Sequence, residues 1–169
     1  MNQTNQPRSP LVIHAARPGD VPVILGMIQE LAEFEQLAHM VVADAPLLHE
    51  ALFGPRPACE CVIGSEDGKP VTFALFFHNF STFLGRRGLY LEDLYVQPAA
   101  RRRGHAKAML AHLAALAVER GCGRFEWSVL DWNVNAIGFY EGLGATVMPE
   151  WRICRLTGPG LQALATSRA

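Results

Sequence analysis

The stretch that decides the fold is Gly88-Leu-Tyr-Leu-Glu-Asp-Leu-Tyr-Val-Gln-Pro-Ala-Ala-Arg-Arg-Arg-Gly-His-Ala-Lys-Ala-Met-Leu-Ala-His-Leu113. Its first part, residues 89–96, is rich in aromatic and aliphatic residues, as is typical of a buried strand. Pro98 should end this strand, because proline cannot donate a hydrogen bond to a neighbouring strand. After Gly104 the apolar residues recur with the period of a helix, at Met109, Leu110, Leu113, Leu116 and Ala117. The stretch therefore predicts a strand, a basic turn and a helix.

The start of the predicted helix has the chemistry of an anion-binding site. The first N–H groups of a helix have no partner within it, and the helix dipole is positive there. Gly104 lets a ligand approach the backbone, and Arg101, Arg102 and Arg103 add positive charge. The turn has neither the Gly-Lys-Ser/Thr ending of a P-loop nor a Gly-x-Gly-x-x-Gly pattern. We therefore expect a site for a pyrophosphate, with a solvated basic helix start as the alternative.

Two adjacent acids, Glu92 and Asp93, lie in the middle of the predicted strand. Burying a carboxylate costs free energy unless it is paired or hydrogen-bonded, so this pair indicates a functional site. Successive residues of a regular strand face opposite sides, so only one acid would face a given site unless a β-bulge turns both toward it. A structural role, in which backbone N–H groups bind the carboxylates, is the alternative for each acid.

The rest of the chain alternates irregularly between strand-like and helix-like segments. Further strands are predicted at residues 11–16, 59–65, 71–79, 124–130 and 151–156. Helices are predicted after Asp20, which suits an N-cap, from Asp44, at residues 134–143, and weakly from Leu161. The first of these helices has an apolar face made of Val23, Met27, Ile28, Leu31 and Phe34. Asp67-Gly68 predicts a β-hairpin, whereas residues 80–87 predict a loop.

This order of elements predicts an α/β fold with a mixed sheet. Residues 1–10 are expected to be a flexible tail, and residues 11–169 a single domain. Half of the residues are hydrophobic, which is enough for a sizeable core. The formal net charge of -1 argues against nucleic acid as a partner. No apolar run is long enough for a membrane span or a signal peptide.

The cysteines and histidines indicate no special site. Cys59, Cys61, Cys122 and Cys154 form no Cys-x-x-Cys pair, and the six histidines show no metal-ligand spacing. We therefore expect reduced thiols in a cytoplasmic protein and no metal.

Together these motifs resemble the GNAT superfamily of N-acetyltransferases. Arg101-x-x-Gly104-x-Ala106 after such a strand is similar to the coenzyme A loop of that superfamily. The segments 90–96, 132–135 and 139–145 resemble its diamine acetyltransferase branch, which includes spermidine/spermine and thialysine acetyltransferases. The resemblance covers roughly residues 11–157. It implies a mixed, mostly antiparallel sheet with helices on both faces, and a central strand-helix-strand unit that binds acetyl-CoA. It also implies that the strands at 89–96 and 124–130 splay apart, and that the protein is a homodimer.

The resemblance also assigns roles in a direct attack of an amine on acetyl-CoA. Glu92 is expected to be the base and Tyr140 the acid for the leaving thiolate, although Tyr140 alone would suggest a core residue. The residues expected to bind the cofactor are Leu94 and Val96 through their N–H groups, Arg101, Arg102, Arg103, Gly104, His105, Ala106 and Asn133. For His105 a solvent-facing position is the alternative, and for Asn133 a helix cap. The residues expected to bind the amine are Glu35, Asp93, Glu150 and Trp151.

We therefore expect acetyl-CoA-dependent N-acetylation of a small primary amine. The segment 80–87 contains Ser81-Thr82, two arginines and no acid, so a thialysine-like diamino acid or short diamine is favoured over spermidine or spermine. Arg86, Arg87 or Arg152 would then receive a substrate carboxylate, or would be solvated or bind CoA phosphate. More remote alternatives are a protein N-acetyltransferase and a non-catalytic acyl-CoA-binding module.

Overall fold

The computed structural model describes residues 10–167 of the 169-residue chain, so all of the predicted tail except Pro10 lies outside the described residues. The chain divides into two compact units, one ending at Ser128 and the other beginning at Val129.

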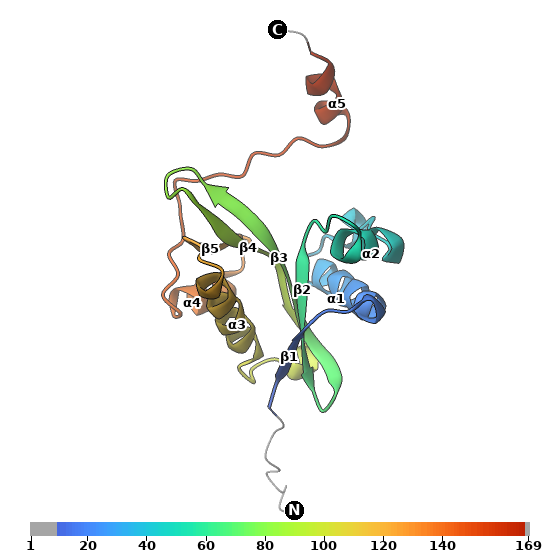
Figure 1. The fold of residues 1–169 in the computed structure, drawn as a ribbon, viewed down its shortest axis with the longest axis vertical. Helices are drawn as coiled ribbons and strands as arrows, with labels where there is room; N and C mark the ends of the chain where they lie inside the picture. The colour runs from blue at the N-terminus through green and yellow to red at the C-terminus, as the bar shows by residue number, and fades with distance from the viewer. Residues whose placement is uncertain (1–9, 168–169) are drawn as a thin grey trace, which may run out of the picture. The chain divides into compact units, whose positions relative to one another are not determined.

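The first unit is built on a five-stranded sheet in which the spatial order follows the chain (Figure 1). Its strands are β1 (Val12–Ala15), β2 (Glu60–Glu66), β3 (Lys69–Ser81), β4 (Arg86–Val96) and β5 (Phe125–Trp127). Neighbours from β1 to β4 are antiparallel, whereas β5 runs parallel to β4. This confirms the mixed, mostly antiparallel sheet. The last strand is shorter than the predicted segment 124–130.

Helices cover both faces of this sheet, as predicted. The helices α1 (Val21–Phe34) and α2 (Ala45–Phe53) lie on one face, and α3 (His105–Glu119) lies on the other (Figure 1). Short 3-10 turns occur at Pro18–Asp20, Ala38–Met40 and Pro98–Ala100.

The core on the α1 face is formed by helix and strand residues together. Ile24 and Met27 of α1 are buried against Phe73 and Leu75 of β3. The predicted apolar face of α1 was slightly rotated about the helix axis relative to the observed buried face. The prediction omitted Ile24, which is buried, and included Phe34, which is exposed. The other predicted residues of that face are partly buried against the same core, apart from Met27, which is fully buried.

The opposite face is covered by α3, whose apolar side follows the prediction. Met109, Leu110, Leu113 and Ala117 are buried, and so are Leu89 and Leu91 of β4. The strand-turn-helix prediction for this stretch is therefore confirmed.

The predicted turns are confirmed in part. Asp67 and Gly68 have φ angles of 48° and 73° in the hairpin between β2 and β3. Asp44 caps α2 by accepting a hydrogen bond from the Leu47 N–H at 2.9 Å. The side chain of Asp20 instead accepts from the Arg17 N–H in the preceding turn, at 2.8 Å, so it does not cap α1 as predicted. The predicted loop at 80–87 is wrong, because β3 runs to Ser81 and β4 begins at Arg86, leaving only a tight hairpin turn.

The second unit contains two short helices, α4 (Val134–Glu141) and α5 (Gly158–Thr166). The predicted strand at 151–156 is wrong, because this segment has no regular secondary structure. A strand requires a neighbour to pair its N–H and C=O groups, and the described residues of this unit contain no other strand.

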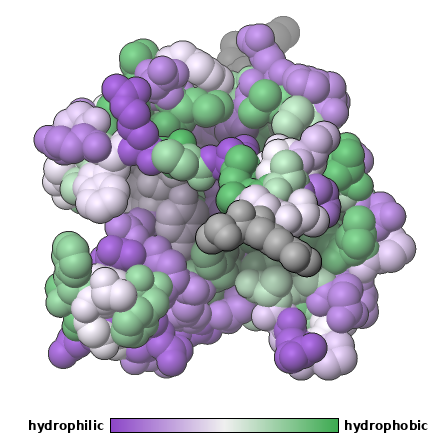
Figure 2. All heavy atoms as spheres, turned by 90° about the horizontal axis from the view of Figure 1, so that it is seen from above, coloured by the Kyte–Doolittle hydropathy of each residue, from purple (hydrophilic) through white to green (hydrophobic). Residues whose placement is uncertain are grey.

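Apolar residues also reach the surface. Figure 2 shows hydrophobic residues lying among hydrophilic ones on the face that it presents. Scattered exposed hydrophobic residues are ordinary on folded proteins. Among the described residues, no helix is long and apolar enough to cross a membrane.

Candidate active site

A β-bulge lies at the acid pair of β4. Leu91 pairs with Phe76 of β3, and Asp93 pairs with Leu75, so Glu92 is the extra residue between two successive pairs. Residues directly opposite each other in an antiparallel pair share a face. Since Leu75 and Phe76 face opposite sides of the sheet, Leu91 and Asp93 do so as well. The bulge that we considered from the sequence is therefore present.

The bulge directs Asp93 to the face that carries α1. Its partner Leu75 belongs to the core formed with that helix, as does Tyr95 two residues later. In a regular strand Asp93 would share the face of Leu91, which is buried. One extra residue thus removes a carboxylate from the apolar α3 face, where it would be uncompensated.

The backbone of β4 changes partners at the same point. Leu89 donates its N–H to the Arg124 carbonyl on the β5 side at 3.0 Å, whereas Gln97 donates its N–H to the Val71 carbonyl on the β3 side at 2.9 Å. N–H groups alternate between the two edges of a strand. Counting back from Gln97, the N–H groups of Leu94 and Val96 point away from β3.

No strand of the first unit covers the edge to which these N–H groups point. Pairing between β4 and β5 joins residues 89–91 to residues 125–127 and ends there. Parallel strands that pair over three residues and then separate agree with the predicted splay. The N–H groups of Leu94 and Val96 are thus oriented to bind a carbonyl oxygen of a ligand.

Three carboxylates lie near the bulge. The pKa of Asp93 is raised to about 6, first by burial and then by the negative charges of Glu92 and Glu35. Burial also raises the pKa of Glu35, which caps the C-terminal end of α1. Glu92 is exposed, which corrects our expectation that both acids of the pair are buried. An alkylammonium ion would relieve the repulsion among these groups, so the cluster is suited to binding a cationic amine.

The start of α3 retains the features predicted for an anion site. Gly104 has a φ of 85° and Arg102 a φ of 63°, so two residues of the turn are left-handed. The first helical bond runs from the Ala108 N–H to the Gly104 carbonyl at 2.9 Å, which leaves the N–H groups of the preceding residues without helical partners. Turns of this kind form concave surfaces of N–H groups that bind phosphates.

The three arginines of the turn have different surroundings. The Arg101 Nε donates to the Val96 carbonyl at 2.9 Å, and its guanidinium lies over the rings of Phe34 and Tyr95. The Arg103 guanidinium binds Glu66 at 2.7 Å and the Ala99 carbonyl at 2.7 Å. Among the described residues, the Arg102 side chain has no partner. Arg102 is therefore the arginine most available to a phosphate.

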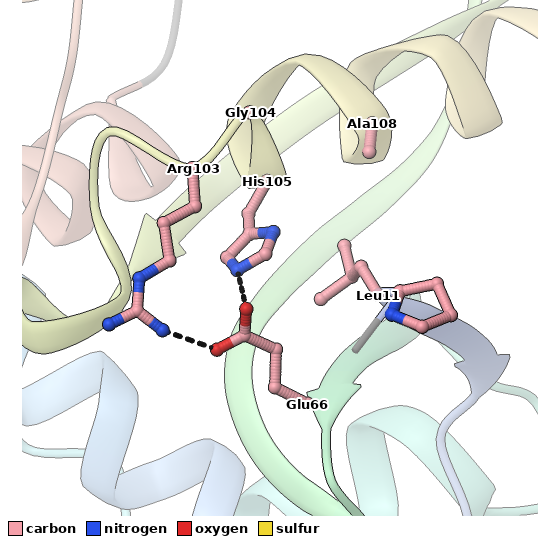
Figure 3. A pocket seen from close by; sticks show the side chains of 7 residues that line it. Leu11, Glu66, Arg103, Gly104, His105 and Ala108 are labelled. Atoms are coloured by element: carbon pink, nitrogen blue, oxygen red, sulfur yellow. Dashed lines mark hydrogen bonds and ion pairs between the residues drawn. The ribbon is translucent and has the colours of Figure 1, made fainter. Parts of the chain in front are cut away.

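Glu66, at the end of β2, links the hairpin to the start of α3 (Figure 3). Its two oxygens bind Arg103 at 2.7 Å and the His105 Nε2 at 2.9 Å. Because an ionised carboxylate only accepts hydrogen bonds, the Nε2 of His105 carries the proton. His105 is 6% exposed, so it does not face solvent, and a cavity of about 360 Å³ lies beside it. Sequence reasoning missed Glu66, because nothing near residue 66 indicates a partner almost 40 residues away.

Of the predicted site residues, four lie in the second unit. Asn133 caps α4, because its Oδ1 accepts from the Ala136 N–H at 3.2 Å. Tyr140 lies in α4 beside Phe139, with ring centroids 5.4 Å apart. Glu150 is exposed, and Trp151 is 74% exposed. Within the described residues, no cluster of histidines, cysteines and acids can hold a metal ion.

A strand edge left open by its neighbours, followed by a helix start that suits phosphate, is the arrangement that the resemblance to N-acetyltransferases implies. The model of the acetyltransferase (GNAT) family matches residues 27–145, and the chain belongs to this family of N-acetyltransferases. An L-ornithine N5-acetyltransferase of Arabidopsis thaliana is 36% identical, over 90% of this chain and 86% of its own length. A thialysine N-epsilon-acetyltransferase of Sus scrofa is 35% identical, over 92% and 97%. An integron cassette protein from V. cholerae has a similar solved structure, with a TM-score of 0.78 and 25% identity over 93% of this chain and 98% of its own.

Proposed function

We propose that this N-acetyltransferase moves the acetyl group of acetyl-CoA to a primary amine of a small diamino acid or short diamine. The observation that carries the proposal is the bulge at Glu92, which places an open strand edge beside three carboxylates. Similar proteins named for thialysine and L-ornithine, which are both diamino acids, support this substrate class.

The acids would bind the amine and remove its proton. Alkyl amines have a pKa near ~10, so the substrate arrives as an ammonium ion. Asp93 and Glu35 would bind this cation. Glu92, the exposed residue of the bulge, would accept the proton directly or through a water molecule, which gives the free amine that attacks the thioester.

The backbone would hold the cofactor and the reacting carbonyl. The N–H groups of Leu94 and Val96 would bind the acetyl oxygen and the pantetheine, and they would stabilise the negative charge that develops during attack. The turn from Arg101 to Ala106 would bind the pyrophosphate through its N–H groups and Arg102, while Glu66 fixes the side chains of Arg103 and His105.

The second unit would supply the remaining groups. We propose Tyr140 as the acid for the leaving thiolate, and Asn133 as a group that orients the pantetheine while it caps α4. Glu150 and Trp151 would line the amine site. Positioning should matter more than the proton from Tyr140, because a thiol has a pKa of only about 8.5.

The location and assembly that we predicted remain proposals. Four free cysteines support a cytoplasmic protein. The homodimer rests on the family, and gel filtration with light scattering would test it.

The register argues against Arg86 and Arg87 as the site for a substrate carboxylate. Because Glu92 is an extra residue, the separation is counted along β3, where Asp93 pairs with Leu75, Arg87 with Phe80 and Arg86 with Ser81. Arg87 thus faces the opposite side of the sheet from Asp93, and Arg86 lies six positions away, which corresponds to about 20 Å at ~3.3 Å per residue. A diamino acid spans less than about 9 Å, and an arginine side chain adds about 7 Å. These arginines therefore lie too far from the acids to bind the same small substrate.

An amine panel tests the proposed function. Thialysine, L-ornithine, L-lysine, putrescine and spermidine would each be incubated with acetyl-CoA, with thiol release and product mass as readouts and a reaction without amine as control. We expect the highest kcat/KM for a diamino acid or the short diamine. A clear preference for spermidine would show that the substrate is a polyamine rather than a diamino acid or short diamine. Thiol release at the background rate with every amine would contradict the function.

A further inference from the structure

A second cavity, of about 630 Å³, lies at the other end of β4 from the acids. Its walls come from β3, the β3–β4 hairpin turn, the start of β4 and the end of α3. The lining residues that matter here are His78, Phe80, Arg86, Arg87 and Arg120. All of them belong to the first unit, and none has a role in the proposed reaction.

The cavity has an excess of positive charge. Arg120 is neutralised by Glu60, with bonds of 2.5 and 2.7 Å from its two terminal nitrogens. Neither Arg86 nor Arg87 forms a side-chain ion pair or hydrogen bond with any described residue. Two arginines that line the cavity thus have no counter-charge from the described residues.

His78 also lines the cavity. Its Nε2 is buried and has no hydrogen-bond partner among the described residues. Its pKa is lowered, first by burial and then by the charges of Arg120 and Arg87, while Glu60 raises it. Because the buried Nε2 has almost no exposed surface, a ligand in the cavity does not reach it.

The dipole of α3 opposes an anion at this position, but only weakly. The C-terminal end of a helix carries about half a negative charge. The two unpaired guanidinium groups carry two full positive charges, which outweigh it. The ring of Phe80, which is 62% exposed, adds an apolar surface to the cavity wall.

We propose that this cavity is a binding site for a small organic phosphate monoester. Arg86 and Arg87 would neutralise its two negative charges, because guanidinium groups bind phosphate bidentately. The exposed ring of Phe80 would contact the organic part. The site is separate from the start of α3, where we place the pyrophosphate of acetyl-CoA.

Nuclear magnetic resonance of the ¹⁵N-labelled full chain tests this proposal with phenyl phosphate as the probe at constant ionic strength. The amides of Gly85 and Gly121 report on the cavity, and that of Gly104 reports on the start of α3. We expect phenyl phosphate to shift Gly85 and Gly121. The double variant Arg86→Gln/Arg87→Gln should weaken this binding by about tenfold or more, whereas Arg56→Gln should not.

The spectra also show whether each variant is folded. If the glutamine double variant is misfolded, Arg86→Lys/Arg87→Lys keeps the charge but loses the bidentate fork, and it should bind the probe measurably more weakly than the wild type. The proposal is overturned if phenyl phosphate shifts only Gly104, or if the double variant binds it as well as the wild type does. Shifts at Gly85 with poly-glutamate and none with phenyl phosphate would assign the cavity to an acidic polypeptide, and would also overturn the proposal.

Discussion

The two halves of β4 differ although they belong to one strand. Before the bulge, Leu89 and Leu91 are buried, and the strand pairs with neighbours on both edges. After the bulge the strand pairs, among the described strands of the first unit, only with β3, and its acids lie beside the edge that these strands leave open. The first half is a structural element with arginines at its start, and the second half carries the acids and N–H groups of the proposed reaction. One extra residue, Glu92, separates them.

Deleting Glu92 should have the largest effect on activity. The deletion keeps Leu91 opposite Phe76 and Asp93 opposite Leu75, so the rest of the sheet keeps its register. It removes both the proposed base and the bulge, and we expect kcat/KM to fall by about 10²-fold or more. Glu92→Ala removes only the side chain. If the deletion and Glu92→Ala have the same rate, the bulge itself contributes nothing to catalysis.

Gly104→Val should weaken binding of CoA by about tenfold or more while the protein stays folded. A Cβ at Gly104 meets no atom within 4 Å, but its φ of 85° is unfavourable for a β-branched residue, and the side chain would block a phosphate. Calorimetry would measure the affinity, and circular dichroism the fold. Gly19→Val, where a Cβ also meets no atom within 4 Å and φ is not positive, should leave affinity unchanged. Unchanged affinity in Gly104→Val would exclude the start of α3 from cofactor binding.

Asp93→Asn should stabilise the protein at pH 8 while it impairs binding of the amine. The folded-state pKa of about 6 exceeds the ordinary value of 3.8, so the folded protein holds this proton more tightly than the unfolded chain does. Stability therefore falls as the pH rises from about 4 to 6, and asparagine avoids this loss. We expect a gain of about 1–3 kcal/mol at pH 8 and little change at pH 4.

Denaturant unfolding at the two pH values would measure this difference. Asp131→Asn, at an exposed position, is the matched control and should leave the free energy of unfolding unchanged. A gain that is equal at pH 4 and pH 8 would show that Asp93 is not a desolvated carboxylate.

Glu66→Gln should have the smallest effect, raising the KM for acetyl-CoA by about two- to fivefold with little change in kcat. The substitution removes the charged partner of buried His105 and frees Arg103, which is 38% exposed. The freed charge of Arg103 would favour binding of the cofactor phosphates, but solvent screens it. Loss of the buried contact between Glu66 and His105 is not screened and loosens the turn, so the net effect should be a higher KM. Glu60→Gln, which frees Arg120 at the other end of β4, should leave this KM unchanged. A lower KM in Glu66→Gln would mean that charge, rather than position, limits binding.

The sequence was most informative where local chemistry determines structure. Periodicity and Pro98 were sufficient to predict β4 and α3, and Asp67-Gly68 predicted its hairpin. The acid pair indicated a bulge but not its register, because the register depends on which β3 residues face α1. The pairing of Glu66 with His105 depends on folding of distant segments, so no local pattern reveals it. The strand predicted at 151–156 did not form, because its apolar residues indicated a strand but could not supply a partner for it.

Amide hydrogen exchange along β4 tests the central claim most directly. The N–H groups of Leu89 and Gln97 are hydrogen-bonded to backbone carbonyls and should exchange slowly with or without ligand. The N–H groups of Leu94 and Val96 should exchange rapidly in the free protein, and saturating acetyl-CoA should slow them by about tenfold or more. If Leu94 and Val96 exchange slowly without ligand, or if acetyl-CoA leaves their exchange unchanged, the second half of β4 does not bind the acetyl group.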